Sequence, residues 1–321
     1  MSLWIVVLLF VVGLIAIIKG GDMFVDAATW MAEVSGIPKL IIGATVVSLA
    51  TTLPELIVSV MATLDGKIDM AIGNAVGSVT ANTGLIMAIS LLFIPTVIKR
   101  RDYVFKAFFM LSATLILVAC GFIGSIGVIG SALLLIIFVF AVVENINEAH
   151  LYMGEMSKKN PYSEKRIIVA KEKKANIVKF FIGAAAIVIG SRLLVDNGSN
   201  LATLLGVPER IIAVTLVALG TSLPELVTTL SAIIKKESSI SVGNIIGANI
   251  IDLTFILPVC SILSGKTIPV SGTLALLDLP AALLVGSIAL LPTLFMKKFA
   301  RWQGVLLLIA YFSYIIVTIT I

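Results

Sequence analysis

Residues 50–55 read Ala-Thr-Thr-Leu-Pro-Glu, and residues 220–225 read Gly-Thr-Ser-Leu-Pro-Glu. In each stretch, two hydroxyl residues and a leucine come before a proline, and a glutamate follows it. Because proline has no N–H group, the carbonyl oxygens of Ala50 and Gly220 lose the hydrogen bond that a regular helix would give them. We therefore expect each stretch to interrupt a helix and to leave backbone oxygens free to bind a cation.

The side chains around each proline are spaced to share one helix face. Thr51 and Glu55 are four residues apart, and so are Thr221 and Glu225. Residues four apart in a helix lie on the same side of it. Each copy of the motif therefore predicts a hydroxyl and a carboxylate that meet at one place.

The composition is that of a membrane protein. Of the 321 residues, 59% are hydrophobic and 13% are charged, whereas soluble domains carry about 25% charged residues. Eleven apolar segments can be counted, and the first two, separated only by Gly20 and Gly21, are interpreted as one long bent span. We therefore predict an all-α integral membrane protein with ten transmembrane helices.

A repeat links the two halves of the chain. When the sequence is shifted so that Leu53 meets Leu223, it aligns with itself without a gap from about residue 20 to residue 85. With five spans in each half, the second copy is reversed in the membrane, and such inverted repeats are typical of secondary transporters. We predict a first five-helix repeat at 1–145, a cytoplasmic linker loop at 146–176 and a second, inverted repeat at 177–321.

The positive charges predict the orientation. If the N-terminus lies outside, the cytoplasmic loops, to which Lys106 is assigned, hold 18 Lys and Arg residues and the outer loops hold 3. This imbalance fits the positive-inside rule. We expect a multi-pass protein of the cell membrane with both termini outside and the basic linker in the cytoplasm.

Three acids are predicted to lie in the middle of the spans: Glu55, Glu225 and Asp252. A charge there costs at least about 2.5 to 3.5 kcal/mol, so such residues usually have a function. The alternative is a structural ion pair, but the two basic residues predicted within spans, Lys19 and Arg192, have nearer acids. Those nearer acids are Asp22, Asp26 and Asp196.

The helix after each motif carries polar residues at a spacing of four, which are Asn74, Ser78 and Asn82 in the first copy and Asn244, Ala248 and Asp252 in the second. Glycines beside them suit close helix packing. Carboxylate, hydroxyl, amide and carbonyl oxygens are hard donors that suit Na⁺, Ca²⁺, Mg²⁺ or Mn²⁺. With one histidine and two cysteines, both in or near apolar spans, we expect no thiolate or zinc site, no cofactor and no enzymatic activity.

These paired motifs resemble the two alpha repeats of the calcium/cation antiporter superfamily, most closely its sodium/calcium exchanger branch. The resemblance implies antiport of Na⁺ against Ca²⁺ by alternating access, with the first and sixth helices sliding across the rest. It also implies the site. Thr51, Glu55, Thr221 and Glu225 would surround calcium; Ser78, Ser222 and the carbonyls of Ser48 and Ala218 would serve sodium; Asn82 and Asp252 would complete the centre.

Ala248 departs from this pattern, because a serine matching Ser78 is expected there. Its absence keeps a proton-coupled calcium or manganese antiporter open as the alternative. A cation channel or an intramembrane hydrolase fits less well, since neither a repeated filter nor a nucleophile with its base is found. We expect the partners to be Na⁺, Ca²⁺ and the lipid bilayer, without nucleic acid, and a monomer as the form.

Overall fold

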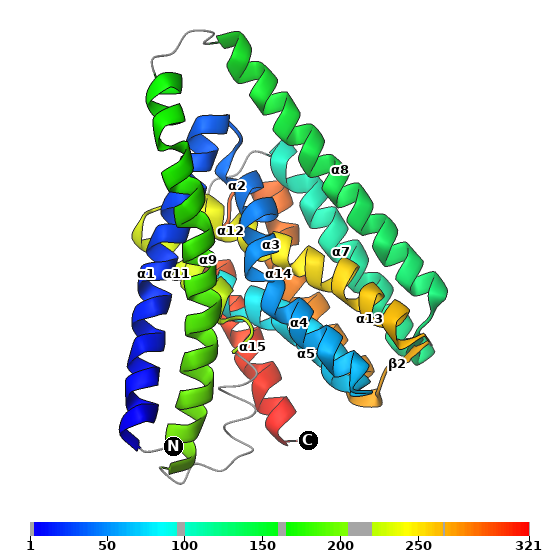
Figure 1. Cartoon of the computed structure of the whole chain (residues 1–321). Helices are drawn as coiled ribbons and strands as arrows, with labels where there is room; N and C mark the ends of the chain where they lie inside the picture. Colours follow the sequence, from blue (N-terminus) through cyan, green and yellow to red (C-terminus); the bar gives the residue numbers. More distant parts are fainter. Residues whose placement is uncertain (1–2, 95–99, 160–164, 205–219, 266, 321) are drawn as a thin grey trace.

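A computed structural model describes residues 3–94, 100–159, 165–204, 220–265 and 267–320 (Figure 1). Within these residues, eight helices are long and apolar enough to cross a membrane, and a pair bent by 44°, Lys39–Thr51 with Leu53–Leu64, makes a ninth span. The shorter apolar helix α11, Leu223–Ile234, lies in the remaining predicted span, the seventh in chain order. The all-α membrane fold is thereby confirmed.

The elements of the first half are α1 (Leu3–Ser35), α2 (Lys39–Ile42), η1 (Gly43–Val47), α3 (Ser48–Thr51), α4 (Leu53–Leu64), α5 (Ile68–Ala81), η2 (Asn82–Met87), α6 (Ala88–Phe93), α7 (Arg100–Ile123), β1 (Ser125–Ile126) and α8 (Val128–Lys159). Those of the second half are α9 (Lys165–Leu204), α11, α12 (Ser238–Ile251), η4 (Asp252–Ile256), α13 (Leu257–Ser264), β2 (Ile268–Pro269), η5 (Leu274–Asp278), α14 (Leu279–Met296) and α15 (Arg301–Thr320). The η segments are π-helical turns. The two short strands pair in an antiparallel way and join the α7–α8 turn to the segment before η5.

The repeat seen in the sequence is present in the backbone. The helices α4 and α11 have the same length and begin at equivalent positions of the two copies, and the same holds for α5 and α12. A π-helical turn then begins at Asn82 in one copy and at Asp252 in the other. The copies cross in opposite directions, because α5 contacts η4 while α12 contacts η2.

Two long helices, α1 and α9, lie side by side at one edge of the molecule (Figure 1). Glycines allow them to approach closely: a Cβ atom added at Gly190 would lie 2.9 Å from the carbonyl oxygen of Gly13, and one at Gly20 would lie 3.0 Å from that of Gly183. The single long span predicted across Gly20 and Gly21 is present as one continuous helix. These glycines provide close packing.

The centre of the fold is the long span that contains α12, which is buried along its length. It packs against α2, η1 and α3 of the first copy. Gly43 and Gly243 meet there so closely that a Cβ on Gly243 would overlap the carbonyl oxygen of Leu40. The two copies are therefore held backbone to backbone, and side chains near this contact are fixed in place.

The positions of the first and last helices fit an even number of spans. The start of α1 and the end of α15 lie at one end, and the end of α8 and the start of α9 lie at the other (Figure 1). The stretch predicted as a linker loop differs from the prediction, because α8 continues to Lys159 and α9 begins at Lys165. Its Lys, Glu and Ala residues are good helix formers, which explains the extension.

Candidate ion-binding site

Each proline lies in the first turn of a helix, and in the first copy, where the preceding residues are described, the helix is interrupted there as predicted. In the first copy α3 ends at Thr51 and α4 begins at Leu53, with Pro54 in the first turn; in the second copy α11 begins at Leu223, with Pro224 in the first turn. Proline is well accepted in that position because its missing N–H would have no helical partner there. Each interruption therefore places the following glutamate at the start of a new helix.

Glu55 and Glu225 lie in the first turns of α4 and α11 and are completely buried. A helix start carries a partial positive charge, which favours a carboxylate there. Among the described residues, the carboxylate oxygens of both glutamates have no hydrogen-bond partner of normal geometry. Buried polar atoms are almost always paired in folded proteins, so these four oxygens are available to a ligand.

Hydrogen bonds between the copies tie the motifs together. The hydroxyl of Thr51 donates to the side-chain oxygen of Asn244 at 3.1 Å, and the hydroxyl of Thr221 donates to that of Asn74 at 3.3 Å. These are equivalent contacts in the two repeats. Thr51 also lies close to the carboxylate of Glu225, without a hydrogen bond of normal geometry. Each threonine therefore reaches from its own copy into the other.

The π-helical turns start at the two equivalent polar residues Asn82 and Asp252, both fully buried. Asn82 donates its amide to the side-chain oxygen of Asn249 at 3.2 Å, and both carboxylate oxygens of Asp252 have no partner among the described residues. Such turns often occur at functional sites, because they change the direction of side chains within a helix.

Asn249 is a residue that the sequence reasoning missed. It is buried and donates to the hydroxyl of Thr83 at 2.7 Å while it accepts from Asn82. It falls outside the four-residue spacing of the polar stripe, and its equivalent in the first copy is Val79. A second amide in an apolar span was the available signal.

The remaining predicted ligands have different surroundings. The hydroxyls of Ser78 and Ser222 are buried and have no partner among the described residues. The carbonyl oxygen of Ser48 already accepts hydrogen bonds from the amide of Thr52 at 2.9 Å and from the hydroxyls of Thr51 and Thr52. Ala218 lies outside the described residues.

One expected free carbonyl is not free. The oxygen of Gly220 accepts a hydrogen bond from the amide of Leu223 at 3.4 Å, because the chain turns there instead of continuing as a helix. The proline removes the regular partner as predicted, and a nearer amide replaces it.

The three buried acids are close enough to repel one another. Glu225 and Asp252 both act electrostatically on Glu55. In the described part of the chain, no group of three or more His, Cys, Asp or Glu residues is gathered around a single point that could hold a metal ion. A cation bound here would therefore combine some of these carboxylates with hydroxyl, amide or carbonyl oxygens.

The other acids near the spans have partners that differ from the prediction. Asp26 and Asp22 pair with Lys235, at 2.6 and 3.8 Å, rather than with Lys19. No ion pair joins Arg192 to Asp196 in the described structure. Folding brings the end of α11 against α1, which the sequence distance could not reveal.

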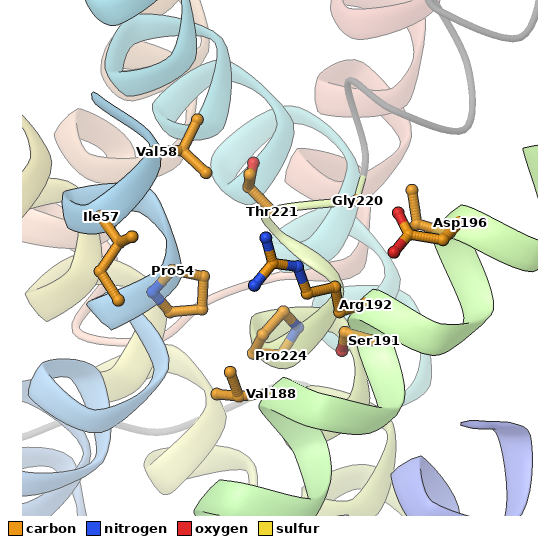
Figure 2. Close-up of a pocket in the computed structure, with 11 residues that line it drawn as sticks. Pro54, Ile57, Val58, Val188, Ser191, Arg192, Asp196, Gly220, Thr221 and Pro224 are labelled. Atoms are coloured by element: carbon orange, nitrogen blue, oxygen red, sulfur yellow. The ribbon is translucent and has the colours of Figure 1, made fainter. Parts of the chain in front are cut away.

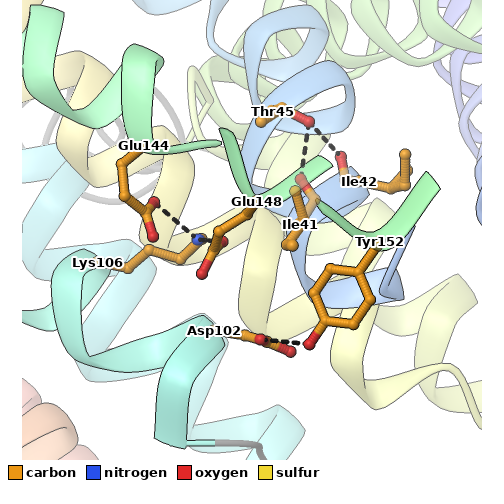
Figure 3. A network of polar contacts seen from close by, with 8 residues as sticks. All are labelled: Ile41, Ile42, Thr45, Asp102, Lys106, Glu144, Glu148 and Tyr152. Atoms are coloured by element: carbon orange, nitrogen blue, oxygen red, sulfur yellow. Dashed lines mark hydrogen bonds and ion pairs between the residues drawn. The ribbon is translucent and has the colours of Figure 1, made fainter. Parts of the chain in front are cut away.

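A second buried polar cluster joins α7 to α8 (Figure 3). Lys106, predicted in a loop, is buried within a span and pairs with Glu148 at 2.7 Å and Glu144 at 3.3 Å. Beside it, the hydroxyl of Tyr152 donates to Asp102 at 2.6 Å. Two of these acids therefore share a basic partner, whereas the three acids of the candidate site have none in the described structure.

Comparison with known proteins places the chain in a wider context. A family described as sodium/calcium exchanger protein matches residues 5–146 and 175–320. The sodium/calcium exchanger MaX1 of Methanosarcina acetivorans is 30% identical over 350 residues and 97% of each chain is covered. An uncharacterized membrane protein of Methanocaldococcus jannaschii is 31% identical over 94% of each chain. Structures of the sodium-calcium exchanger NCX_Mj soaked with Na⁺ and Sr²⁺ superimpose with a TM-score of 0.76 at 28% identity, over 98% of this chain and 99% of that one.

Proposed function

Because this chain belongs to the sodium/calcium exchanger family, we propose that it exchanges Na⁺ for Ca²⁺ across the membrane by alternating access, using the buried centre between its two repeats. The observation that carries the proposal is the pair of equivalent, fully buried glutamates, Glu55 and Glu225, whose four carboxylate oxygens have no hydrogen-bond partner among the described residues. Without a bound cation such a centre is costly in a membrane.

The proposed calcium ligands are Glu55, Glu225, Thr51 and Thr221. Calcium takes six to eight oxygen ligands and accepts bidentate carboxylates. The hydrogen bonds of the threonines to Asn244 and Asn74 support this assignment, because they orient both hydroxyls toward the contact between the copies. Asn82 and Asp252, one span further on, would complete the centre.

The proposed sodium ligands are the hydroxyls of Ser78 and Ser222 and the carbonyls of Ser48 and Ala218, together with the shared acids. The two serine hydroxyls are buried and unpartnered in the described structure, as expected of ligands without their ion. Shared acids explain the exchange physically: sodium and calcium compete for the same charges, and the unloaded centre would carry its net charge through the membrane.

The ions are substrates, and we propose neither a resident cofactor nor an enzymatic activity. One chain contains both halves of the centre, so a monomer is sufficient. For orientation we propose both termini outside and the α8–α9 connection in the cytoplasm. With the buried Lys106 left out, 17 of the 18 basic residues first counted then face inward against 3 outward.

The test is ion flux in proteoliposomes that contain the purified chain. An outward-directed sodium gradient is expected to drive calcium into the vesicles, and a potassium gradient of the same size serves as control. Calcium uptake that follows a pH gradient and ignores sodium would overturn the proposal. Protein with the double change Glu55→Gln and Glu225→Gln provides the background rate.

A further inference from the structure

Each long helix faces a helix that begins with a proline motif: α1 faces α11, and α9 faces α4. We call these two boundaries the α1–α11 seam and the α9–α4 seam, and the first of them is closed. The ammonium of Lys235, at the end of α11, lies 2.6 Å from Asp26 and 3.8 Å from Asp22 on α1. Just beneath, Gly21 packs so tightly that an added Cβ atom would lie 2.8 Å from a methyl group of Val227. Ion pair and close packing therefore hold α1 against α11.

The equivalent seam in the other repeat is open. The residues that correspond to Gly21 and Val227 in the other copy are Ser191 on α9 and Ile57 on α4. These two residues lie on opposite walls of a cavity of about 210 Å³ that Thr221, a proposed ligand, also lines (Figure 2). The two seams lie at equivalent positions of the repeats, yet one seam is packed and the other is hollow.

The charges at the two seams are equivalent in position and opposite in sign. Asp22 corresponds to Arg192 and Lys235 corresponds to Asp65. Figure 2 shows Arg192 extending from α9 into the cavity, and in the described structure it forms no ion pair. Among the described residues, the basic residue nearest to Asp65 is Lys67 at 4.0 Å, and both side chains are exposed. Because both charges are reversed, Arg192 and Asp65 would attract each other as Asp22 and Lys235 do.

A second ion pair shows the same reversal. Lys39 lies 2.6 Å from Glu237, and the equivalent positions in the other copy are occupied by Glu209, which is outside the described residues, and Lys67. In both ion pairs, therefore, each charged residue is replaced in the other copy by a residue of the opposite charge. This agreement favours a pairing relationship over a chance distribution of charge.

We propose that Arg192 and Asp65 are positioning residues that form an ion pair when the cavity closes, as the Lys235 pairs with Asp22 and Asp26 open. The inference rests on the proposed exchange function, since inverted repeats produce the opposite-facing state by exchanging their arrangements. The described structure then has the α1–α11 seam latched and the α9–α4 seam open toward the site.

We call the Lys235 ion pairs and the proposed Arg192–Asp65 ion pair the two latches, and they differ in strength. Asp26 makes the shorter contact with Lys235, but its equivalent is Asp196, another acid. On closing, Asp65 would meet one attractive and one repulsive partner, whereas Lys235 has two attractive ones. The α9–α4 latch is therefore the weaker, which favours the described arrangement when no ion gradient is present.

The test uses cysteines at Ile57 and Ser191 as reporters, in a chain whose Cys120 and Cys260 are replaced by alanine. They are expected to cross-link only when the cavity closes. In this background Arg192→Gln and Asp65→Asn should each lower the cross-linking rate about twofold to fivefold, the range of a partly exposed ion pair. The two changes combined should lower it no further, because they remove one interaction.

Three further variants complete the design. Asp196→Asn should raise the cross-linking rate, Lys235→Gln should raise it by weakening the opposite latch, and Asp69→Asn, an exposed acid on the same hairpin, is the matched control without effect. Reporters that never cross-link, or additive effects of Arg192→Gln and Asp65→Asn, would overturn the latch. The readout needs no transport, so an absence of sodium-driven flux would count against the exchange function alone.

Discussion

The hydroxyl of Thr51 donates a hydrogen bond to the side-chain oxygen of Asn244, 3.1 Å away in the other repeat. The equivalent bond joins Thr221 to Asn74. Each repeat therefore orients a proposed calcium ligand of the other, and neither half of the chain could form the centre alone. The contacts also explain why the polar stripes follow the proline motifs at the same distance in both copies.

Replacing Glu55 or Glu225 by Gln should reduce calcium exchange to the background rate. The change keeps the size of the side chain but removes a charge and the bidentate binding that calcium favours. The measurement is sodium-driven calcium uptake, after size-exclusion chromatography has shown that the variant is folded. Near-normal uptake in either variant would mean that the site is placed wrongly.

Asp252→Asn should be milder than the two glutamate changes. The equivalent position is already an amide, Asn82, and both residues start a π-helical turn. The loss of charge should first alter the dependence on sodium, with calcium uptake reduced but measurable. A complete loss of calcium exchange in this variant would contradict the ranking of the three acids.

Ala248→Ser should change the sodium dependence of exchange more than the calcium affinity. It restores the hydroxyl that Ser78 provides in the first copy, and position 248 is fully buried. The sodium concentration that gives half-maximal calcium uptake should fall, because sodium gains an oxygen ligand. An unchanged value would show that this position does not face the ions.

Lys106→Met should destabilise the protein by about 3 kcal/mol or more, because it leaves one buried and one partly buried carboxylate without their base. Lys106 pairs with both Glu144 and Glu148 (Figure 3). Thermal unfolding in detergent measures the effect. Changing both glutamates to Gln in the same chain should restore most of the lost stability; if it does not, the loss comes from packing instead of charge.

Gly243→Ala should lower stability by about 1 to 3 kcal/mol, the usual cost of overpacking. The added methyl group would overlap the carbonyl oxygen of Leu40 where the repeats meet. Gly286→Ala is the matched control, since its new Cβ atom would lie 3.7 Å from its nearest neighbours. Equal melting temperatures for the two variants would rule out the close contact.

Much of this protein could be predicted without coordinates, because the strongest physical constraints in a membrane are local. A span must satisfy its own backbone hydrogen bonds, so apolar runs indicated helices, and a proline followed by a glutamate indicated where two of them are interrupted. The constant offset between the copies related Glu55 to Glu225 and Asn82 to Asp252. The predicted helices, the repeat and the family all followed from such patterns.

Only the tertiary structure decided which side chains become partners when they lie far apart in the chain. Lys106 looked like a loop residue and Lys19 looked like the partner of Asp22, yet Lys106 is buried against α8 and Asp22 faces Lys235. The packed seam at Gly21 and the hollow one at Ser191 lie at equivalent positions of the two copies and differ in packing. Sequence spacing gives the face of a helix on which a residue lies, whereas the neighbour on that face depends on how the helices pack together.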